Sequence, residues 1–376
     1  MSFRHRIILT GGGTGGHIYP ALAVAEQLKA DESVEAILYI GAKGHREEKL
    51  AQEHGLDFIG LPVSGLPRQL SPKLLTWPAQ FFSAVSAARK LIDRFQPTAV
   101  LGTGGYASAP PLAAALLAQK KIAIHEPDAH PGLANRVFAR YARLISLGMA
   151  AAQNRFGHTD ARVVVNGNPV SKRFLSLPAK TDALAQLGLV GNKTTVLVTG
   201  GSQGALALNQ AVYDLLPMIR EHNSPLQILH QVGEKNWQAM ETSLDSDVRN
   251  SPFYKPRPYF DHLEVAYAAC DLTICRAGAM TIAELFVTGT PAIFVPYPFA
   301  AQDHQTFNAR AVEAQGGARV VLQPELSGKL LYEVLTMLNQ NEDMLRDMRK
   351  QMLSLARPRA AADLAEQLKL IGQQNH

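Results

Sequence analysis

Three short segments of the sequence are rich in glycine and end in polar or small residues. They read TGGGTGGH at 10–17, GTGGYAS at 102–108 and TGGSQGA at 199–205. Glycine lets a backbone approach a phosphate closely, and a helix that follows such a loop offers unpaired N–H groups and its positive dipole end. The loops therefore predict a phosphorylated ligand in preference to simple tight turns.

The first loop also matches the dinucleotide fingerprint G-x-G-x-x-G. A nicotinamide or flavin site needs, in addition, an acid at the end of the second strand for the ribose hydroxyls. That strand ends YIGAKGHR with no acid at the expected place, and the loop itself carries Thr14 and His17. We therefore expect a phosphate site of another kind, and no cofactor.

A second concentration of polar residues lies in 275–309, CRAGAMTIAELFVTGTPAIFVPYPFAAQDHQTFNA. A helix beginning at 279–281 could take a phosphate, and Glu284 is placed one turn later to accept two hydrogen bonds from a vicinal diol such as ribose. The polar segment 303–308 can contact sugar hydroxyls. The alternatives are a solvated helix face for Glu284 and helix capping for the amides Gln305 and Asn308. The occurrence of all these residues together, in this order, favours a sugar nucleotide.

Strands must position these loops. Apolar runs such as RIILT, TAVLG, KIAIH and ARLIS alternate with helical patterns, which indicates parallel βαβ units. The pattern restarts at 193–219, so we predict two α/β domains in tandem. The segment 166–192 is broken by Pro and Gly and is expected to connect them. An amphipathic helix, set off by Pro358, ends the chain.

All three glycine loops follow predicted strands, and they are divided between the two domains. In open α/β sheets, ligands bind at the carboxyl ends of the strands. The expected fold class is thus two Rossmann-like, doubly wound parallel sheets facing a cleft.

Charge is distributed unevenly along the chain. Residues 1–170 carry 18 Lys and Arg against 12 Asp and Glu, a net +6, whereas 171–376 carry 19 against 20, a net −1. A basic half suits nucleic acid, a phosphorylated ligand or an anionic membrane. No nucleic-acid signature accompanies it, so we expect no nucleic-acid partner.

The remaining composition points to a reducing compartment. Cys270 and Cys275 form a lone C-x4-C pair, which favours two core thiols over zinc. The apolar run near the N-terminus is too short for a signal peptide, so the chain is expected to stay in the cytoplasm. The uncharged stretch 96–119 contains Gly, Ser and Pro and suits a strand, loop and helix better than a membrane span.

One segment, 66–90, has the composition of an interfacial contact. Apolar and aromatic residues are flanked there by cations. They are Leu74, Leu75, Trp77, Phe81 and Phe82, with Arg68, Lys73, Arg89 and Lys90. The alternative, which we expect to hold for about half of the apolar residues, is that they face the domain core.

Taken in order, the motifs resemble those of the MurG family. They are GGTGGHIYPALAVA, GTGGYASAP, HE, NGNPV, GGSQGALALN, CRAGAMTIAE and DHQTFNA, and they extend over nearly the whole chain. The resemblance implies an inverting glycosyltransferase of the GT-B fold. It implies transfer of N-acetylglucosamine (GlcNAc) from UDP-GlcNAc to lipid I, giving lipid II for peptidoglycan.

The resemblance also implies site residues. For the donor they are Thr14, Gly15, Gly16, Asp128, Ser171, Ser202, Gln203, Phe260, Ala279, Met280, Thr281, Glu284 and Gln305. Ser202 and Gln203 would approach the phosphates or uridine, a backbone contact of Phe260 the uracil, and 279–281 the diphosphate. Glu284 would bind the ribose and Gln305 the GlcNAc hydroxyls. The acceptor's diphosphate would face Gly104, Gly105 and Tyr106.

Two positions depart from the family pattern. Asp128 stands where the family usually has Asn, and a carboxylate only accepts hydrogen bonds. Ser171 stands where an Arg is usual, followed by Lys172 and Arg173. A missing cation should weaken donor binding unless Arg173 replaces it.

The chemistry needs charge stabilisation on the leaving diphosphate and a base for the acceptor hydroxyl. Helix N-termini and loop amides can supply the first, so no metal site is predicted. The one D-x-D, at 245–247, is expected to be a surface turn. Candidate bases are His17, His125 and Glu126, of which we favour His17 for its loop position and the usual pKa of histidine.

The resemblance assigns 1–170 to the acceptor and membrane, with helix 357–372 packing back on it, and 171–356 to UDP-GlcNAc. Expected partners are UDP-GlcNAc, lipid I, the anionic inner-membrane surface and cell-wall synthesis or division proteins. The expected location is peripheral, on the cytoplasmic face of the inner membrane, with roles in cell shape and cell division. A transferase to another lipid acceptor, a UDP-GlcNAc epimerase and a non-catalytic UDP-sugar-binding protein remain alternatives.

Overall fold

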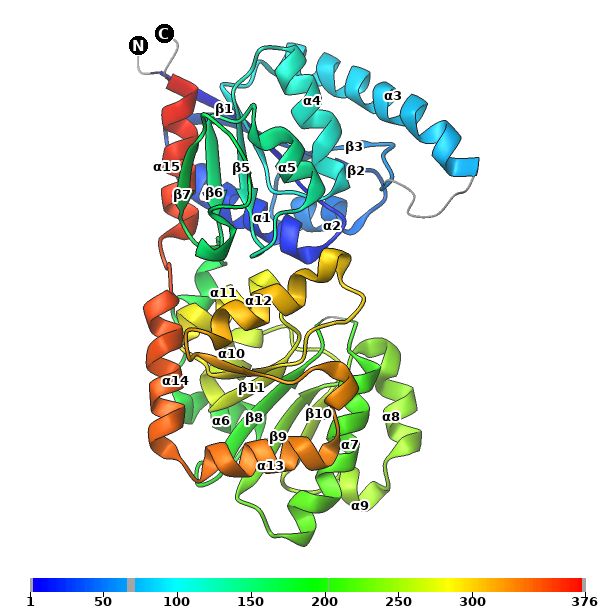
Figure 1. Cartoon of the computed structure of the whole chain (residues 1–376), viewed down its shortest axis with the longest axis vertical. Helices are drawn as coiled ribbons and strands as arrows, with labels where there is room; N and C mark the ends of the chain where they lie inside the picture. Colours follow the sequence, from blue (N-terminus) through cyan, green and yellow to red (C-terminus); the bar gives the residue numbers. More distant parts are fainter. Residues whose placement is uncertain (1–2, 66–71, 202, 374–376) are drawn as a thin grey trace. The chain divides into compact units, whose positions relative to one another are not determined.

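The computed structural model describes residues 3–65, 72–201 and 203–373, which form two α/β units (Figure 1). The first unit comprises Met1–Ser171 and Arg357–His376, and the second comprises Lys172–Ala356. The chain thus leaves the first unit once and returns to it for its last helix.

The first unit is built on a parallel sheet, seven-stranded over the described residues, in the order β3-β2-β1-β4-β5-β6-β7. The strands are β1 His5–Thr10, β2 Val34–Ala42, β3 Asp57–Leu61, β4 Ala99–Gly102, β5 Ile122–Glu126, β6 Leu144–Leu147 and β7 Arg162–Val165. The helices are α1 Gly15–Lys29, α2 Arg46–Glu53, α3 Pro72–Phe95, α4 Ala109–Leu117, α5 Leu133–Ala139 and α15 Ala360–Gln373, with 3-10 turns at Tyr106–Ser108 and Ala150–Ala152.

Helices cover both faces of this sheet. Alternate residues of a strand point to opposite faces. Accordingly, Ile7 and Leu9 pack with α1 and α15 in one core, whereas Ile8 packs with α3 and α4 in another. Figure 1 shows α15, at the red end of the chain, alongside the sheet and α1.

The second unit has a six-stranded parallel sheet in its described part, in the order β10-β9-β8-β11-β12-β13. Its strands are β8 Thr194–Thr199, β9 Leu226–Gln231, β10 Tyr254–Arg257, β11 Leu272–Cys275, β12 Ala292–Phe294 and β13 Ala318–Val320. Its helices are α6 Lys180–Leu187, α7 Leu206–Glu221, α8 Trp237–Ser243, α9 Ser246–Arg249, α10 Leu263–Ala269, α11 Ala279–Thr288, α12 His304–Glu313, α13 Gly328–Asn339 and α14 Glu342–Leu355. 3-10 turns lie at Lys172–Phe174, Glu234–Asn236, Ala301–Asp303 and Gln323–Glu325.

The core of the second unit contains a large apolar cluster. Val196 and Val198 of β8 pack against Leu208 and Val212 of α7. Cys270 and Cys275 are both buried free thiols, as expected for core residues.

The two parallel α/β units confirm the prediction of two doubly wound parallel-sheet domains. The prediction did not identify β3, β7 and β10, which all lie at sheet edges. Polarity explains only β10, which reads YKPR, since an edge strand tolerates polar residues and Pro where one side of the ladder is unpaired. The strands β3 (DFIGL) and β7 (RVVV) are short apolar runs that the prediction missed.

The expected connection at 166–192 is only partly correct. The chain does pass between the units there, between Ser171 and Lys172. Its second half, however, folds as α6, which packs against α10 and buries Ala183. The helix itself contains no Pro or Gly: Pro178 precedes it, and Gly188 ends it in a left-handed conformation.

No helix within the described ranges is long and apolar enough to span a bilayer.

Candidate functional site

The first glycine loop connects β1 to α1. Its first half is tied to the sheet, because Tyr39 Oη donates to the Gly11 carbonyl at 2.9 Å and the Gly12 N–H donates to the Gly104 carbonyl at 3.3 Å. Its second half runs into the first turn of α1, where amide groups have no acceptor within the helix. The loop therefore presents N–H donors at Gly15 and Gly16, as an anion site requires.

The second glycine loop follows β4, the neighbour of β1 in the sheet. Both strands are parallel, so the two loops lie at the same edge. Gly104 has a φ of +100°, and a Cβ there would lie 2.8 Å from His17 Nδ1. Only glycine therefore permits this approach to the histidine.

The half-buried His17 is oriented by this loop. Its Nδ1 lies 3.1 Å from the Thr103 carbonyl oxygen. A carbonyl can only accept, so Nδ1 carries the proton and Nε2 is the basic nitrogen of the neutral ring. Thr103 also donates from its hydroxyl to the His17 carbonyl. The ring is thus held in the tautomer that can accept a proton at Nε2.

His125, by contrast, is fully buried within β5. Its Nε2 lies 2.9 Å from Asn168 Oδ1, and its Nδ1 lies 3.1 Å from Ser146 Oγ. Burial lowers the pKa of His125 to about 4. The imidazole is a neutral core group, so we withdraw it as a candidate base.

Glu126, at the end of β5, is also buried. Its carboxylate accepts from the N–H groups of Asp128 and Gly132, both at 3.0 Å, and from Asn135 Nδ2 at 2.8 Å. Burial, and then the charge of Asp128, raise the pKa of Glu126 to about 8. This side chain organises the loop after β5 and does not reach solvent, so it too is withdrawn as the base.

The third glycine loop connects β8 to α7. Gln231, at the end of β9, donates to Thr199 Oγ1 at 3.2 Å and to the Gly201 carbonyl at 3.0 Å. Its Oε1 accepts the Phe260 N–H at 3.1 Å. The Phe260 carbonyl is therefore the backbone group that remains for a ligand's donor. Ser202 lies outside the described residues.

Gln231 was not predicted as a site residue. The available indication was a polar residue at the last position of a buried strand, beside a glycine loop.

Arg276 was also not assigned a role. It donates to the carbonyls of Val295 and Pro296 at 2.9 and 3.1 Å and to Gln323 Oε1 at 2.7 Å. These bonds fix a positive charge three residues before α11.

The helix α11 begins as predicted, at Ala279. Ala279 and Met280 are buried and Thr281 is partly buried, after an extended Gly278. This helix is ten residues long, and the positive end of its dipole lies at this N-terminus. This terminus has the features needed to bind a phosphate.

Glu284 lies one turn into α11 and is partly buried. Tyr267 Oη donates to Glu284 Oε2 at 3.2 Å. Burial raises the pKa of Glu284 to about 7, opposed by the Tyr267 hydrogen bond and the charge of Arg173. A freely solvated helix face is excluded, and the carboxylate is held in one orientation.

The two amides of the segment 303–308 have different surroundings. Gln305 Oε1 accepts the Tyr297 N–H at 2.9 Å, which leaves its NH₂ group directed as a donor. Asn308 is fully buried and donates to the Ala277 carbonyl at 3.2 Å, tying α12 to the loop before α11. Neither is the N-cap of α12, so the capping alternative is wrong for both.

The cation that follows Ser171 is close to this group of residues. Arg173 Nε lies 3.5 Å from Glu264 Oε2, and Nη1 donates to the Asp261 carbonyl at 3.1 Å. Its charge also lowers the pKa of Glu284. Arg173 therefore supplies positive charge on the side of the sheet where Glu284 lies.

Part of the segment 66–90 forms the start of α3. Leu75 and Phe82 are 86% and 69% exposed. Trp77 stacks on Phe81 at a centroid distance of 5.2 Å, and Phe81 packs against the core. Facing the core is thus correct for Phe81 and wrong for Leu75 and Phe82. Residues 66–71, with Arg68, lie outside the described residues, as do the side chains of Lys73 and Leu74.

Within the described part of the chain, no cluster of three or more His, Cys, Asp or Glu could hold a metal ion. Asp245 and Asp247 are both exposed, at the start of the short helix α9.

Residues 7–146 match the glycosyltransferase family 28 N-terminal domain, and residues 195–368 match the glycosyltransferase family 28 C-terminal domain. The chain is 39% identical to the UDP-N-acetylglucosamine–N-acetylmuramyl-(pentapeptide) pyrophosphoryl-undecaprenol N-acetylglucosamine transferase of Halothermothrix orenii, over 94% of this chain and 95% of that protein.

The structure is similar to that of MurG from Acinetobacter baumannii, with a TM-score of 0.78 and 28% identity over 98% of this chain and 99% of that one. It also resembles the UDP-GlcNAc 2-epimerase of Neisseria meningitidis, with a TM-score of 0.66 but 15% identity, over 97% and 100% of the chains, which shows a shared fold alone. The near full-length identity to the transferase of H. orenii, together with both matched domains, establishes that this chain belongs to the MurG family of glycosyltransferases.

Proposed function

We propose that this protein transfers GlcNAc from UDP-GlcNAc to undecaprenyl-pyrophosphoryl-MurNAc-pentapeptide (lipid I), giving lipid II for peptidoglycan. The observation that carries the proposal is the 39% identity, over 94% of the chain, to a protein with that activity in its name. The oriented imidazole of His17 and the partly buried carboxylate of Glu284 supply two groups that such a reaction uses.

The second unit is proposed to bind the donor. Glu284 would accept hydrogen bonds from the ribose diol, and Gln305 would donate from its NH₂ group to a GlcNAc hydroxyl. The Phe260 carbonyl matches a donor such as the uracil N3–H, since the N–H of that residue is already bonded to Gln231. Gln203 would contact the phosphates or uridine, as would Ser202.

The leaving group needs compensation for its negative charge. As the bond between the anomeric carbon and the diphosphate breaks, the bonding electrons leave with UDP. The first-turn amides at Ala279, Met280 and Thr281 are oriented before the reaction, so they stabilise this charge without reorganisation. Thr14, Gly15 and Gly16 offer a further helix N-terminus for the donor side.

The first unit is proposed to bind the acceptor and to hold the base. His17 Nε2 would accept the proton of the acceptor hydroxyl while its oxygen attacks the anomeric carbon from the face opposite UDP. The Thr103 carbonyl keeps the other nitrogen protonated, so the proton can only go to Nε2. Gly104, Gly105 and Tyr106 would face the acceptor's diphosphate.

The two departures from the family pattern can be interpreted in the same terms. Arg173 pairs with Glu264, and its charge acts on Glu284. It would therefore replace the cation missing at Ser171. Asp128 would add negative charge beside Glu126, where the family has a neutral amide. We expect Arg173 to preserve donor binding. We expect Asp128 to change the pH dependence more than the affinity.

We further propose that the first unit docks on the anionic cytoplasmic face of the inner membrane as a peripheral protein. The support is the net +6 charge of residues 1–170 and the exposure of Leu75 and Phe82 on α3. A lipid-linked acceptor stays in the bilayer, so the acceptor-binding unit must reach its surface. Cell-wall synthesis or division proteins are the partners expected there, with roles in cell shape and division.

The decisive experiment incubates the protein with labelled UDP-GlcNAc and a lipid I analogue and identifies the products. A GlcNAc-β-linked disaccharide lipid and UDP support the proposal. A second reaction with UDP-GlcNAc alone tests the epimerase alternative, which would convert the donor without an acceptor. No transfer to lipid I but transfer to another polyprenyl acceptor would change the assigned substrate.

A further inference from the structure

The third glycine loop packs, at Gln203 and Gly204, directly against the turn 232–236 that follows β9. Gly204 has a φ of +73°, and a Cβ there would lie 2.1 Å from the Val232 carbonyl oxygen. Gly233 has a φ of +93°, and its Cβ would lie 2.6 Å from the Gln203 carbonyl oxygen. The two turns therefore meet backbone to backbone at these positions, with no space for a side chain at either glycine.

Asn236 bridges the two turns. Its Nδ2 donates to the Gln203 carbonyl at 3.2 Å and to the Val232 carbonyl at 3.1 Å. Both partners are acceptors, so only an N–H donor at this position satisfies them. Asn236 also stands at the N-cap of α8, yet its side chain makes no capping bond to that helix. An Asn at this position usually accepts from a backbone N–H of the helix that it caps. The Asn236 side chain instead donates to the glycine loop.

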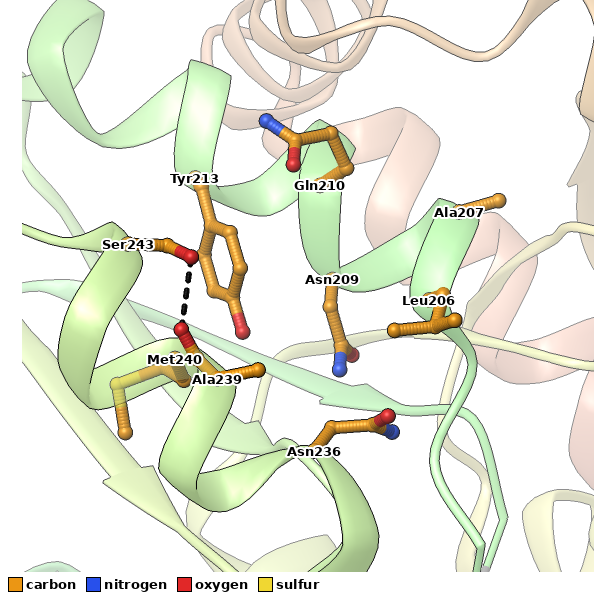
Figure 2. Close-up of a pocket in the computed structure, with 9 residues that line it drawn as sticks. All are labelled: Leu206, Ala207, Asn209, Gln210, Tyr213, Asn236, Ala239, Met240 and Ser243. Carbon is orange, nitrogen blue, oxygen red and sulfur yellow. Dashed lines mark hydrogen bonds between the residues drawn. The ribbon is translucent and has the colours of Figure 1, made fainter.

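The Val232 carbonyl is itself fixed by a second amide. Asn209 of α7 is buried, donates to the same oxygen at 2.9 Å and accepts from His230 Nε2 at 3.1 Å. Figure 2 shows Asn209 and Asn236 next to each other at one end of a pocket between α7 and α8. The pocket encloses about 340 Å³, and Asn236 is only partly buried beside it. Asn236 is therefore the more exposed of the two amides that bind the Val232 carbonyl.

We propose that Asn236 is a positioning residue for donor binding. It holds the Gln203 backbone in the conformation in which the loop meets the phosphates or uridine of UDP-GlcNAc, without touching the donor itself. This inference rests on the proposed function, because it assumes that the loop binds UDP-GlcNAc.

The test uses Asn236→Asp, which keeps the shape of the side chain but replaces the donor with a carboxylate facing two carbonyl oxygens. We expect the KM for UDP-GlcNAc to rise about tenfold for Asp and about threefold for Asn236→Ala, the loss expected for one or two hydrogen bonds. The kcat and the KM for the lipid acceptor should stay at wild-type values. Gln210→Ala is the matched control, because Gln210 lines the same pocket but bonds to Asp214.

Calorimetric titration with UDP-GlcNAc separates the two levels of the argument. If the wild type does not bind UDP-GlcNAc, the proposed function is wrong and this inference falls with it. If the wild type binds and Asn236→Asp and Asn236→Ala bind equally well, only the positioning role is refuted. The positioning role is also refuted if the KM values for donor and acceptor both rise and the melting temperature falls, because that pattern shows a general structural role. If the Asp variant does not fold, the Ala variant decides the same question.

Discussion

Removal of the Glu284 carboxylate gives the most direct test of the donor site. Glu284→Ala should weaken UDP-GlcNAc binding by about 1.5–3 kcal/mol, roughly ten- to hundredfold, which is the usual cost of losing hydrogen bonds to a charged acceptor. The structure supports the upper part of this range, because the Tyr267 hydroxyl already holds the carboxylate in position. Isothermal titration calorimetry at pH 8 measures the difference.

The pH dependence of the same binding has a defined sign. Since the pKa of Glu284 is about 7, the carboxylate that accepts from the diol is fully formed only above neutrality. Donor affinity should therefore increase between about pH 6 and pH 8 and then level off. UDP-GlcNAc suits this measurement because its diphosphate, esterified at both ends, does not titrate in that interval. Glu284→Gln is the matched control, and its affinity should lose this component of the pH dependence.

Stability distinguishes lost binding from lost folding. A carboxyl whose pKa is raised by folding destabilises the folded state progressively as pH rises from the unfolded value, about 4.3, through the folded value of about 7. Glu284→Gln should therefore melt no lower than the wild type at pH 8 while binding the donor more weakly. Equal donor affinity of the Ala variant and the wild type would refute the ribose assignment.

Further predictions address the remaining chemistry. His17→Asn should lower kcat by about a hundred- to ten-thousandfold, with the Kd for UDP-GlcNAc little changed; a kcat near the wild-type value would show that the base lies elsewhere. Transfer should persist in EDTA, since backbone amides and helix termini are proposed to carry the diphosphate charge; activity lost in EDTA and restored by magnesium or manganese would contradict this. Binding to anionic vesicles should fall with salt, and further in Leu75→Ser with Phe82→Ser, without loss of UDP-GlcNAc binding; unchanged vesicle binding would place the docking surface elsewhere.

The sequence was sufficient to predict the elements that precede the glycine loops. A buried parallel strand is a short apolar run, and a helix with Ala and Leu at regular spacing follows each loop, so β1, β4 and β8 were recognisable. The edge strand β10, which reads YKPR, lacks that pattern, whereas β7, which reads RVVV, has it and was still not identified. Their pairing depends on a neighbour that the local sequence does not reveal.

The site residues divide in a similar way. His17 and Glu284 lie within motifs, so their positions could be predicted. The burial of His125 could also have been foreseen, because β5 lies in the interior of a parallel sheet and such strands are covered on both faces. The partners Thr103, Gln231 and Asn236 act through contacts between distant parts of the chain, which no local spacing specifies.

The return of the chain to the first unit has a consequence for biosynthesis. Leu364 and Leu368 of α15 complete the core that β1 and α1 begin, and Lys369 pairs with Asp31. The second unit, in contrast, is one uninterrupted stretch from Lys172 to Ala356. On the ribosome the second unit can therefore complete its core before the first unit does. The first unit keeps one apolar face uncovered until residues 357–376 have emerged. A nascent chain stalled before α15 would present that uncovered face to chaperones.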